Sequence, residues 1–381
     1  MNVRCRPLLL SLLAVVLVVP PVTPCTAFLV AGNDQVLLGN NEDFWDPRTE
    51  VWFEPGKDGR YGAVYLGYVG HVVQGGMNTE GLAFDGFATP AMVPTEQGGK
   101  PVFEGELLNE ALETCATVEE VAELFYAHDL TWLTSAQLLF ADRLGNSVII
   151  EGDEFLFNEH PFQVATNFYQ SQHDDHLQQC DRFAAATVIL DGAEQVSVDL
   201  CRRALAATAQ EIGAPTLYSN VFDLKAGRMH LYNFHNFEDV RVFDLEEELK
   251  KGARTLDLPT LFGPNHAYAH YLEMRQDEIG QAVAARRGPP LAHEVLDGYA
   301  GRWIVDNPAG EPIRVDIRRA GPNLVVDIEG RDGPITLIPQ SSTVFFEVNL
   351  RGEQELVFQG DPTSGYDTFT GLWLPGPGRR N

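Results

Sequence analysis

The chain has 381 residues, of which 44% are hydrophobic and 21% charged, so it can form a packed core and intrinsic disorder is disfavoured. Its 54 acidic and 27 basic residues give a net charge of −27 at pH 7. This charge disfavours nucleic acid and anionic membrane surfaces as partners. The length predicts one large domain or two ordinary ones.

Residues 1–24 have the pattern of a secretory signal. Arg4 and Arg6 precede an apolar run from Leu8 to Val19, and no acidic residue occurs before Asp34. The run is too short to cross a bilayer as a helix, which takes about 20 residues. We therefore expect an exported protein, periplasmic or secreted, whose mature chain does not insert into a membrane.

Strand-like and helix-like segments follow one another in blocks over the next 230 or so residues. Thr117 and Glu120 form a capping box before one of the helices. This order favours an α+β sandwich of antiparallel sheets over a parallel doubly wound fold. The expected strands are 26–31, 35–40, 63–70, 81–88, 136–158, 162–168, 216–224 and 229–237. The expected helices are 105–115, 118–127, 174–190, 197–209 and 244–251.

The sequence changes character near residue 290. Residues 264–287 predict a connecting helix that ends at Gly288-Pro289-Pro290. Short alternating segments separated by turn residues then predict a small all-β barrel or sandwich. The Tyr-Ala-Gly-Arg-Trp run at 299–303 resembles small lipocalin-like domains appended to some secreted hydrolases. We predict a signal at 1–24, a main domain at 25–288 and a β domain at 294–381.

One cysteine, Cys25, directly follows the apolar segment, and the chain then folds back on it. A hairpin loop at residues 32–33 would place Cys25 opposite Asn40, and a loop at 33–34 would place it opposite Glu42. Either register returns residues 40–43 beside Cys25, because opposed residues lie about 5 Å apart.

Cleavage before Cys25 would give this residue both a nucleophile and a base. A free α-amine has a pKa of about 7.7–8.0, and a cysteine thiol one of about 8.5. The two groups can therefore exchange a proton near neutral pH. The carboxylate of Asp43, returning on the second strand, is placed to orient the ammonium.

The segment after Cys25 resembles the start of one branch of the N-terminal-nucleophile (Ntn) hydrolases, which contains the choloylglycine hydrolases, penicillin acylases and linear-amide C–N hydrolases. The resemblance lies in the Cys-Thr opening and the Gly-Asn-Asn-Glu-Asp run at 39–43. Further stretches resemble the same family in the same order, so that the resemblance covers roughly residues 25–260. These stretches are GGMNTEGLAFDGFA (75–88), VATNF (164–168), CDRFAAA (180–186) and FHNFEDVRVFDLEEEL (234–249).

The resemblance implies an αββα sandwich of two antiparallel sheets between helices, a role for four residues, and no metal or organic cofactor. Cys25 would be the nucleophile with its own amine as base, and Asp43 would fix the amine and thiol. Asn167 would donate a side-chain N–H to the oxyanion, and Arg182 would organise the surroundings of Asp43 and Cys25. The implied substrate is a small N-acyl amide, cleaved through a thioester.

Two positions depart from the bile-salt-hydrolase pattern. Asn40 stands where those members carry arginine, and Ala88 where they carry an asparagine oxyanion donor. The substrate therefore stays open among N-acyl amines or amino acids, penicillin-type amides, bile-acid conjugates and acyl-homoserine lactones. Pro24 is a poor residue before a signal-peptidase cut, so the cut can also fall upstream, with autocatalytic removal of the remainder.

Other interpretations remain at this point. An acyltransferase would use the same site with an amine in place of water, and a non-enzymatic exported binding protein would carry Cys25 lipidated or in a disulfide. A Cys180–Cys201 disulfide and a homo-oligomer are left open by the sequence. The histidines in residues 173–176 and the pair His266 and His270 fit surface or core roles better than a metal site.

Overall fold

The computed structural model describes residues 25–93, 99–307, 311–331, 333–350, 352–361, 365–372 and 374–380. The predicted signal at 1–24 lies outside these residues. In the described part, no helix combines the length and the apolarity needed to cross a bilayer.

Two antiparallel sheets form the first part of the molecule. The six-stranded sheet has the order β10-β1-β2-β11-β12-β13. Its strands are β1 (Thr26–Ala31), β2 (Val36–Asp43), β10 (Phe162–Ala165), β11 (Thr216–Asp223), β12 (Arg228–Asn233) and β13 (Asn236–Asp244). β2 lies inside this sheet, between β1 and β11, and all of its residues are buried.

The eight-stranded sheet has the order β14-β3-β4-β5-β6-β7-β8-β9. Its strands are β3 (Thr49–Glu54), β4 (Ala63–Tyr68), β5 (Val72–Asn78), β6 (Ala83–Ala88), β7 (Ala136–Ala141), β8 (Ser147–Glu151), β9 (Glu154–Phe157) and β14 (Arg254–Asp257). The turn before β6 contains Gly81, whose φ of +77° is in the left-handed region that glycine adopts without strain.

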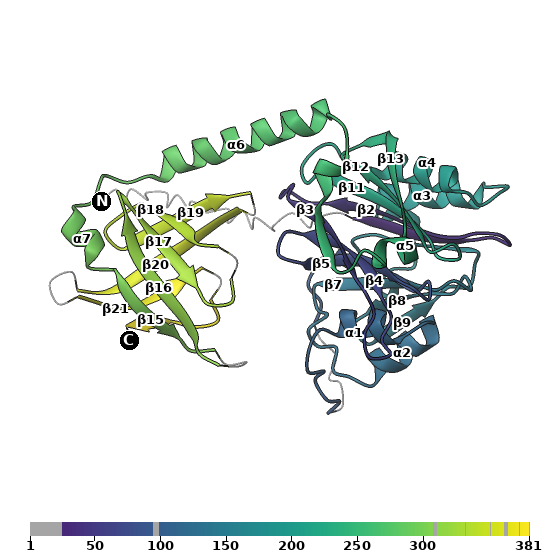
Figure 1. Cartoon of the computed structure of the whole chain (residues 1–381), viewed down its shortest axis with the longest axis horizontal. Helices are drawn as coiled ribbons and strands as arrows, with labels where there is room; N and C mark the ends of the chain where they lie inside the picture. The colour runs from purple at the N-terminus through teal and green to yellow at the C-terminus, as the bar shows by residue number, and fades with distance from the viewer. Residues whose placement is uncertain are drawn as a thin grey trace, which may run out of the picture.

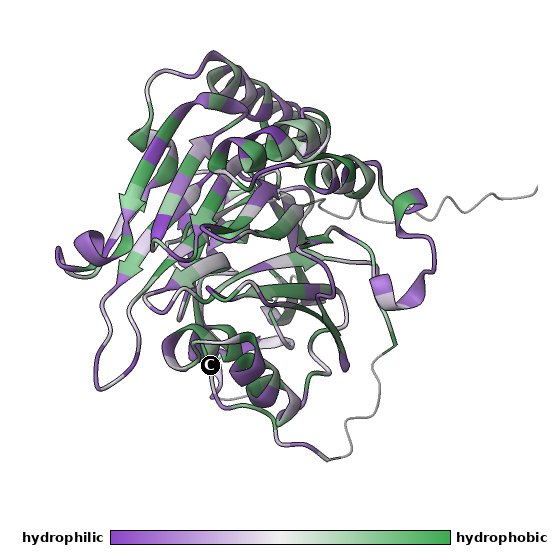
Figure 2. Ribbon diagram, turned by 90° about the vertical axis from the view of Figure 1, so that its right-hand side faces the viewer, coloured by the Kyte–Doolittle hydropathy of each residue, from purple (hydrophilic) through white to green (hydrophobic). Residues whose placement is uncertain are grey.

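Helices pack on the outer faces of both sheets (Figure 2). α1 (Leu107–Thr114) and α2 (Val118–Tyr126) share a hydrophobic cluster with the eight-stranded sheet, and α3 (Asp181–Asp191) and α4 (Val198–Thr208) share one with the six-stranded sheet. A third cluster contains residues of both sheets. The predicted capping box of Thr117 and Glu120 is present at α2.

One predicted helix was too long. Residues 174–190 were expected to be helical throughout, but α3 begins only at Asp181, and a short 3₁₀ turn, η2 (His176–Gln178), precedes it. Another 3₁₀ turn, η1, spans Gln170–Gln172. Residues 173–180 are therefore a loop that contains the turn η2, and the helix begins after it.

A helical bridge leads to the C-terminal domain (Figure 1). After α5 (Leu245–Leu249) and η3 (Leu258–Leu261), α6 (His266–Arg286) occupies the range predicted for a connecting helix. Tyr271 at its start donates to the Trp45 carbonyl over 2.7 Å, and Arg286 at its end donates to Glu353 over 2.6 Å. α6 thus contacts both parts of the chain.

The C-terminal part is a closed β-barrel, which agrees with the all-β domain predicted there. α7 (His293–Asp297) precedes it, and its core is built around Tyr299, Trp303 and Phe358. Its strands are β15 (Gly301–Val305), β16 (Ile313–Ala320), β17 (Asn323–Ile328), β18 (Ile335–Pro339), β19 (Val344–Asn349), β20 (Gly352–Asp361), β21 (Gly365–Gly371) and β22 (Gly378–Arg380).

Candidate active site

Cys25 lies immediately before β1 and is 4% exposed. Its backbone nitrogen donates to Asn167 Oδ1 over 2.6 Å, and its Sγ lies 3.9 Å from the backbone carbonyl oxygen of Asp43. In the full-length sequence this nitrogen belongs to the peptide bond with Pro24. The geometry is therefore that of the chain before any cleavage at this bond.

The β1–β2 register resolves the two hairpin alternatives. Thr26 pairs with Asn41 and Ala31 with Val36, as expected for a loop at residues 33–34. Continued by one residue, this register sets Cys25 opposite Glu42. Because side chains alternate along a strand, Cys25 and Glu42 share one face of the sheet and Asp43 belongs to the other.

The Asp43 carboxylate is fully buried on the side of α3 and α4. It accepts hydrogen bonds from the Thr216 hydroxyl and from Gln210 Nε2, the latter over 3.2 Å, and lies 3.9 Å from Arg182 Nη1. Burial raises the pKa of Asp43 well above its ordinary value, and the Thr216 bond and the Arg182 charge lower it in part. Asp43 contacts the Cys25 thiol through its backbone oxygen.

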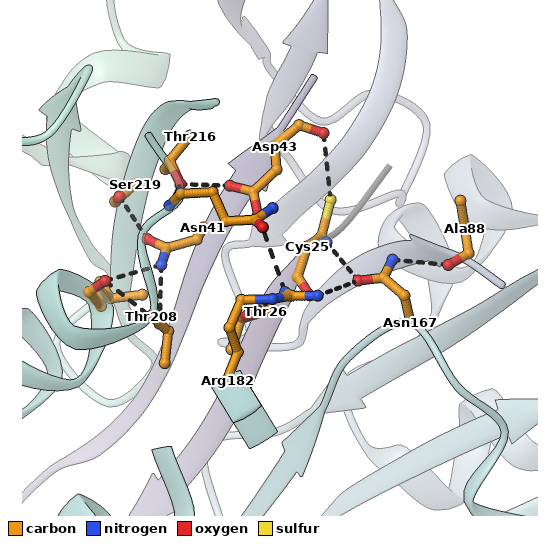
Figure 3. Close-up of polar contacts among 12 residues, drawn as sticks. Cys25, Thr26, Asn41, Asp43, Ala88, Asn167, Arg182, Thr208, Thr216 and Ser219 are labelled. Atoms are coloured by element: carbon orange, nitrogen blue, oxygen red, sulfur yellow. Dashed lines mark hydrogen bonds and ion pairs between the residues drawn. The ribbon is translucent and has the colours of Figure 1, made fainter. Parts of the chain in front are cut away.

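Arg182 and Asn167 hold the backbone around Cys25 (Figure 3). From α3, Arg182 Nη1 donates to the Cys25 carbonyl over 2.5 Å and to Thr26 Oγ1 over 2.6 Å. Its Nη2 donates over 3.0 Å to Asn167 Oδ1, the atom that also accepts from Cys25 N. Asn167 Nδ2 donates to the Ala88 carbonyl over 2.7 Å.

The structure therefore brings together all four residues predicted from the sequence. Their chemical roles remain predictions. Two details differ from the expected arrangement. The Asn167 amide hydrogen expected at the oxyanion is directed at Ala88 in this state, and the Asp43 carboxylate is bonded to Thr216 and Gln210.

A pocket of about 440 Å³ opens beside Cys25. Most of its wall is apolar, and Glu42, Tyr68, Gln74 and Ser135 add polar groups. The apolar wall includes Phe44, Phe84, Phe87, Leu108, Leu133 and Leu138. The pocket can bury an apolar group of moderate size next to the thiol.

The environment of the Cys25 thiol favours its uncharged form. Burial raises its pKa well above the ordinary value, and the nearby carboxyl groups of Glu42, Asp43 and Asp85 raise it further. A nucleophilic attack by Cys25 therefore requires a base that removes the thiol proton as the new bond forms.

Several residues of the site were not predicted from the sequence. Thr216 and Gln210, which hold Asp43, come from β11 and the loop after α4, and Tyr68, which donates to Glu42, comes from the other sheet. No motif marks these positions. The Asn40–Asp43 return segment was expected beside Cys25, but Glu42 was not singled out, because the register was open.

The four cysteines of the described part of the chain form no disulfide. Cys25, Cys115, Cys180 and Cys201 are all free, so the structure does not contain the Cys180–Cys201 disulfide that the sequence left open. In the described part of the chain, no cluster of three or more His, Cys, Asp or Glu side chains is arranged to hold a metal ion.

No protein-family model and no curated protein sequence matches the chain. Among solved structures, it is similar to a penicillin V acylase from Agrobacterium tumefaciens, with 18% identity, a TM-score of 0.49, and coverage of 61% of this chain and 91% of that one. It is also similar to an arginine-to-leucine variant of the conjugated bile acid hydrolase from Clostridium perfringens, with 17% identity and a TM-score of 0.52. A cysteine-to-alanine variant of the same enzyme is also similar, with 16% identity and a TM-score of 0.51. Each of these two comparisons covers 64% of this chain and 99% of the bile acid hydrolase chain.

The likeness to the conjugated bile acid hydrolase shows that this chain shares the fold of that protein over the covered residues. The substrates named for these proteins are theirs. The 64% of this chain covered by these comparisons is close in length to the part of the chain that precedes the barrel.

Proposed function

We propose that the protein is an exported amidohydrolase that cleaves linear amides with an apolar acyl group, with Cys25 as nucleophile. The observation that carries this proposal is the position of Cys25. Its thiol borders an apolar pocket, and its nitrogen is held by Asn167 beside the Arg182 and Asp43 framework. The fold shared with amide hydrolases supports the same reaction class.

Cleavage before Cys25 would turn its peptide nitrogen into an α-amine that stays close to its own thiol. This amine takes the Sγ proton while Sγ bonds to the carbonyl carbon of the substrate. The resulting ammonium returns the proton to the leaving nitrogen as the C–N bond breaks and a thioester remains. Water, deprotonated by the same amine, then hydrolyses the thioester and releases the acid.

The pocket supports the choice of acyl group. Its aromatic and aliphatic wall lies next to the thiol, so the part of the substrate attached to the carbonyl carbon would be buried there. Burial of apolar area contributes about 25 cal/mol per Å². We therefore expect kcat/KM to rise with the apolar area of the acyl group.

A panel of N-acyl p-nitroanilides tests this function. Secreted protein should hydrolyse the members with apolar acyl groups, and Cys25→Ala should reduce the rate by more than about 10³-fold, as expected for loss of a nucleophile. Cys180→Ala, at a half-buried free cysteine away from the pocket, is the matched control and should keep full activity. Unchanged activity in Cys25→Ala would refute the proposal, and release of acyl-amine products with added amines would indicate acyl transfer.

A further inference from the structure

The pocket contains a carboxyl group that the mechanism above does not use. Glu42 on β2 is 1% exposed and lines the pocket together with Cys25. Its Oε1 accepts a hydrogen bond from the Tyr68 hydroxyl. Its Oε2 is buried and has no hydrogen-bond partner among the described residues.

The groups around Glu42 are acidic or neutral. They are the Cys25 thiol across the hairpin, Asn40 and Asp43 in β2, Tyr68 from β4, Asp85 from β6 and Tyr218, its partner on β11. In the described part of the chain, no basic side chain forms an ion pair with Glu42. Arg182, the nearby cation, directs its hydrogen bonds to Cys25, Thr26 and Asn167.

This environment favours the protonated form of Glu42. Burial raises the pKa of Glu42 from 4.5 to about 7. The hydrogen bond from the Tyr68 hydroxyl lowers this pKa in part, and the side chains of Asn40 and Cys25 lower it less. Burial and the charge of Glu42 raise the pKa of Asp85 well above its usual range. Two buried carboxyl groups that have no ion-pair partner are not both ionised at low cost inside a protein.

The Tyr68 bond fixes where the proton lies. A carboxyl oxygen that accepts from a hydroxyl is the carbonyl-like one, so the proton of neutral Glu42 belongs on Oε2. Oε2 then becomes an O–H donor in the wall of an apolar pocket. A ligand oxygen is the partner that such a donor requires.

We propose that Glu42 acts as a neutral carboxylic acid whose Oε2–H donates a hydrogen bond to the carbonyl oxygen of the bound acyl group and to the oxyanion formed when Cys25 attacks. This inference rests on the proposed function. The substrate carbonyl must lie next to Cys25 Sγ, and Glu42 is the residue opposite Cys25 on the same face of the sheet. The Asn167 amide donates to Ala88 in this structure, which leaves room for such a donor.

The test compares Glu42→Gln with Glu42→Leu on an apolar N-acyl p-nitroanilide from about pH 5 to 9. Glutamine keeps a neutral donor of nearly the same shape, whereas leucine removes it. We expect Glu42→Leu to lose about 10²–10³-fold in kcat, the typical effect of one oxyanion donor. Glu42→Gln should stay within about ten-fold of the wild type at pH 5–6. The ratio of wild-type to Glu42→Gln rates should fall above pH 7, where the wild type loses its proton.

Three results would overturn the inference: a Gln variant as slow as the Leu variant, a Leu variant as fast as the wild type, or a loss in both variants confined to substrates with an amino group. The third result would show that Glu42 acts as an anion that binds the positively charged amino group of the substrate. Glu119→Gln, at an exposed position in the first turn of α2, is the matched control and should change nothing. Thermal unfolding of both Glu42 variants separates misfolding from loss of the donor. Failure of the proposed function itself is recognised separately, because wild type and Cys25→Ala would then be equally slow.

Discussion

At the residue scale, the backbone around Cys25 is held by the side chains of Asn167 and Arg182, which come from separate segments of the chain. Asp43, Asn167 and Arg182 were placed near Cys25 by motif and by the hairpin, and the structure brings them there. Which side chain of the return strand shares the face of Cys25 depends on a register shift of one residue. The loop residues 32–34 fit both registers, so Glu42 was found only from the pairing of Thr26 with Asn41.

Glu42 also predicts a pH dependence of stability. Ordinary Glu ionises near pH 4.5, whereas folded Glu42 keeps its proton up to about pH 7. Between these values the folded state binds more protons than the unfolded state, so the free energy of unfolding falls as the pH rises. The difference corresponds to roughly 3 kcal/mol. Urea unfolding at pH 4.5 and 8 should show this loss in the wild type and a smaller loss in Glu42→Gln; equal losses would contradict the assignment.

At the element scale, local sequence signals predicted several helices and strands, but they did not predict the edge strand β13 or the pairing of distant strands. The β1–β2 hairpin, the α2 capping box and α6 follow from turn residues, caps and periodicity. β13 was not assigned from the sequence, because an edge strand with half-exposed residues lacks the apolar run of an inner strand. The final pairing order also joins distant segments, such as β2 with β11, and no local pattern encodes it.

The capping box offers a test of element stability that is independent of catalysis. The Thr117 side chain accepts from the Glu120 backbone N–H, and Glu120 reaches back to the Thr117 nitrogen. Thr117→Ala should lower the free energy of unfolding by about 1 kcal/mol, because an orphan N–H of the helix loses its partner. Denaturant unfolding measures this, and kcat/KM should stay unchanged. A stability equal to that of the wild type would show that solvent replaces the cap fully.

At the scale of the whole molecule, the barrel has a core of its own. The cluster around Trp303 contains only residues of the barrel and the segment leading into it, while α6 joins the two parts through Tyr271 and Arg286. The sequence predicted a boundary near residue 290, because short alternating strand-like segments separated by turn residues begin there. It predicted a barrel or a sandwich there and left the choice between them open, because closure depends on the pairing of β15 with β22 at the far end of the chain.

Separate cores predict separate unfolding transitions. Trp303 is fully buried in the barrel, so Trp303→Ala should destabilise this domain by about 3–5 kcal/mol through the cavity it leaves. Calorimetry of the full chain should show one transition lowered in temperature and the other unchanged, with the amidase rate retained. A joint shift of both transitions would show that the barrel and the first part of the chain unfold as one unit.

The central claim is that Cys25 forms a thioester with the acyl group after its amino group is freed. Peptide mass spectrometry of secreted protein, quenched in acid during turnover of a slowly hydrolysed acyl donor, tests both parts at once. The account predicts a mature chain that begins at Cys25 and carries the acyl mass on this residue. A mature chain that begins elsewhere, or an acyl group on another residue while Cys25 stays unmodified, would contradict it.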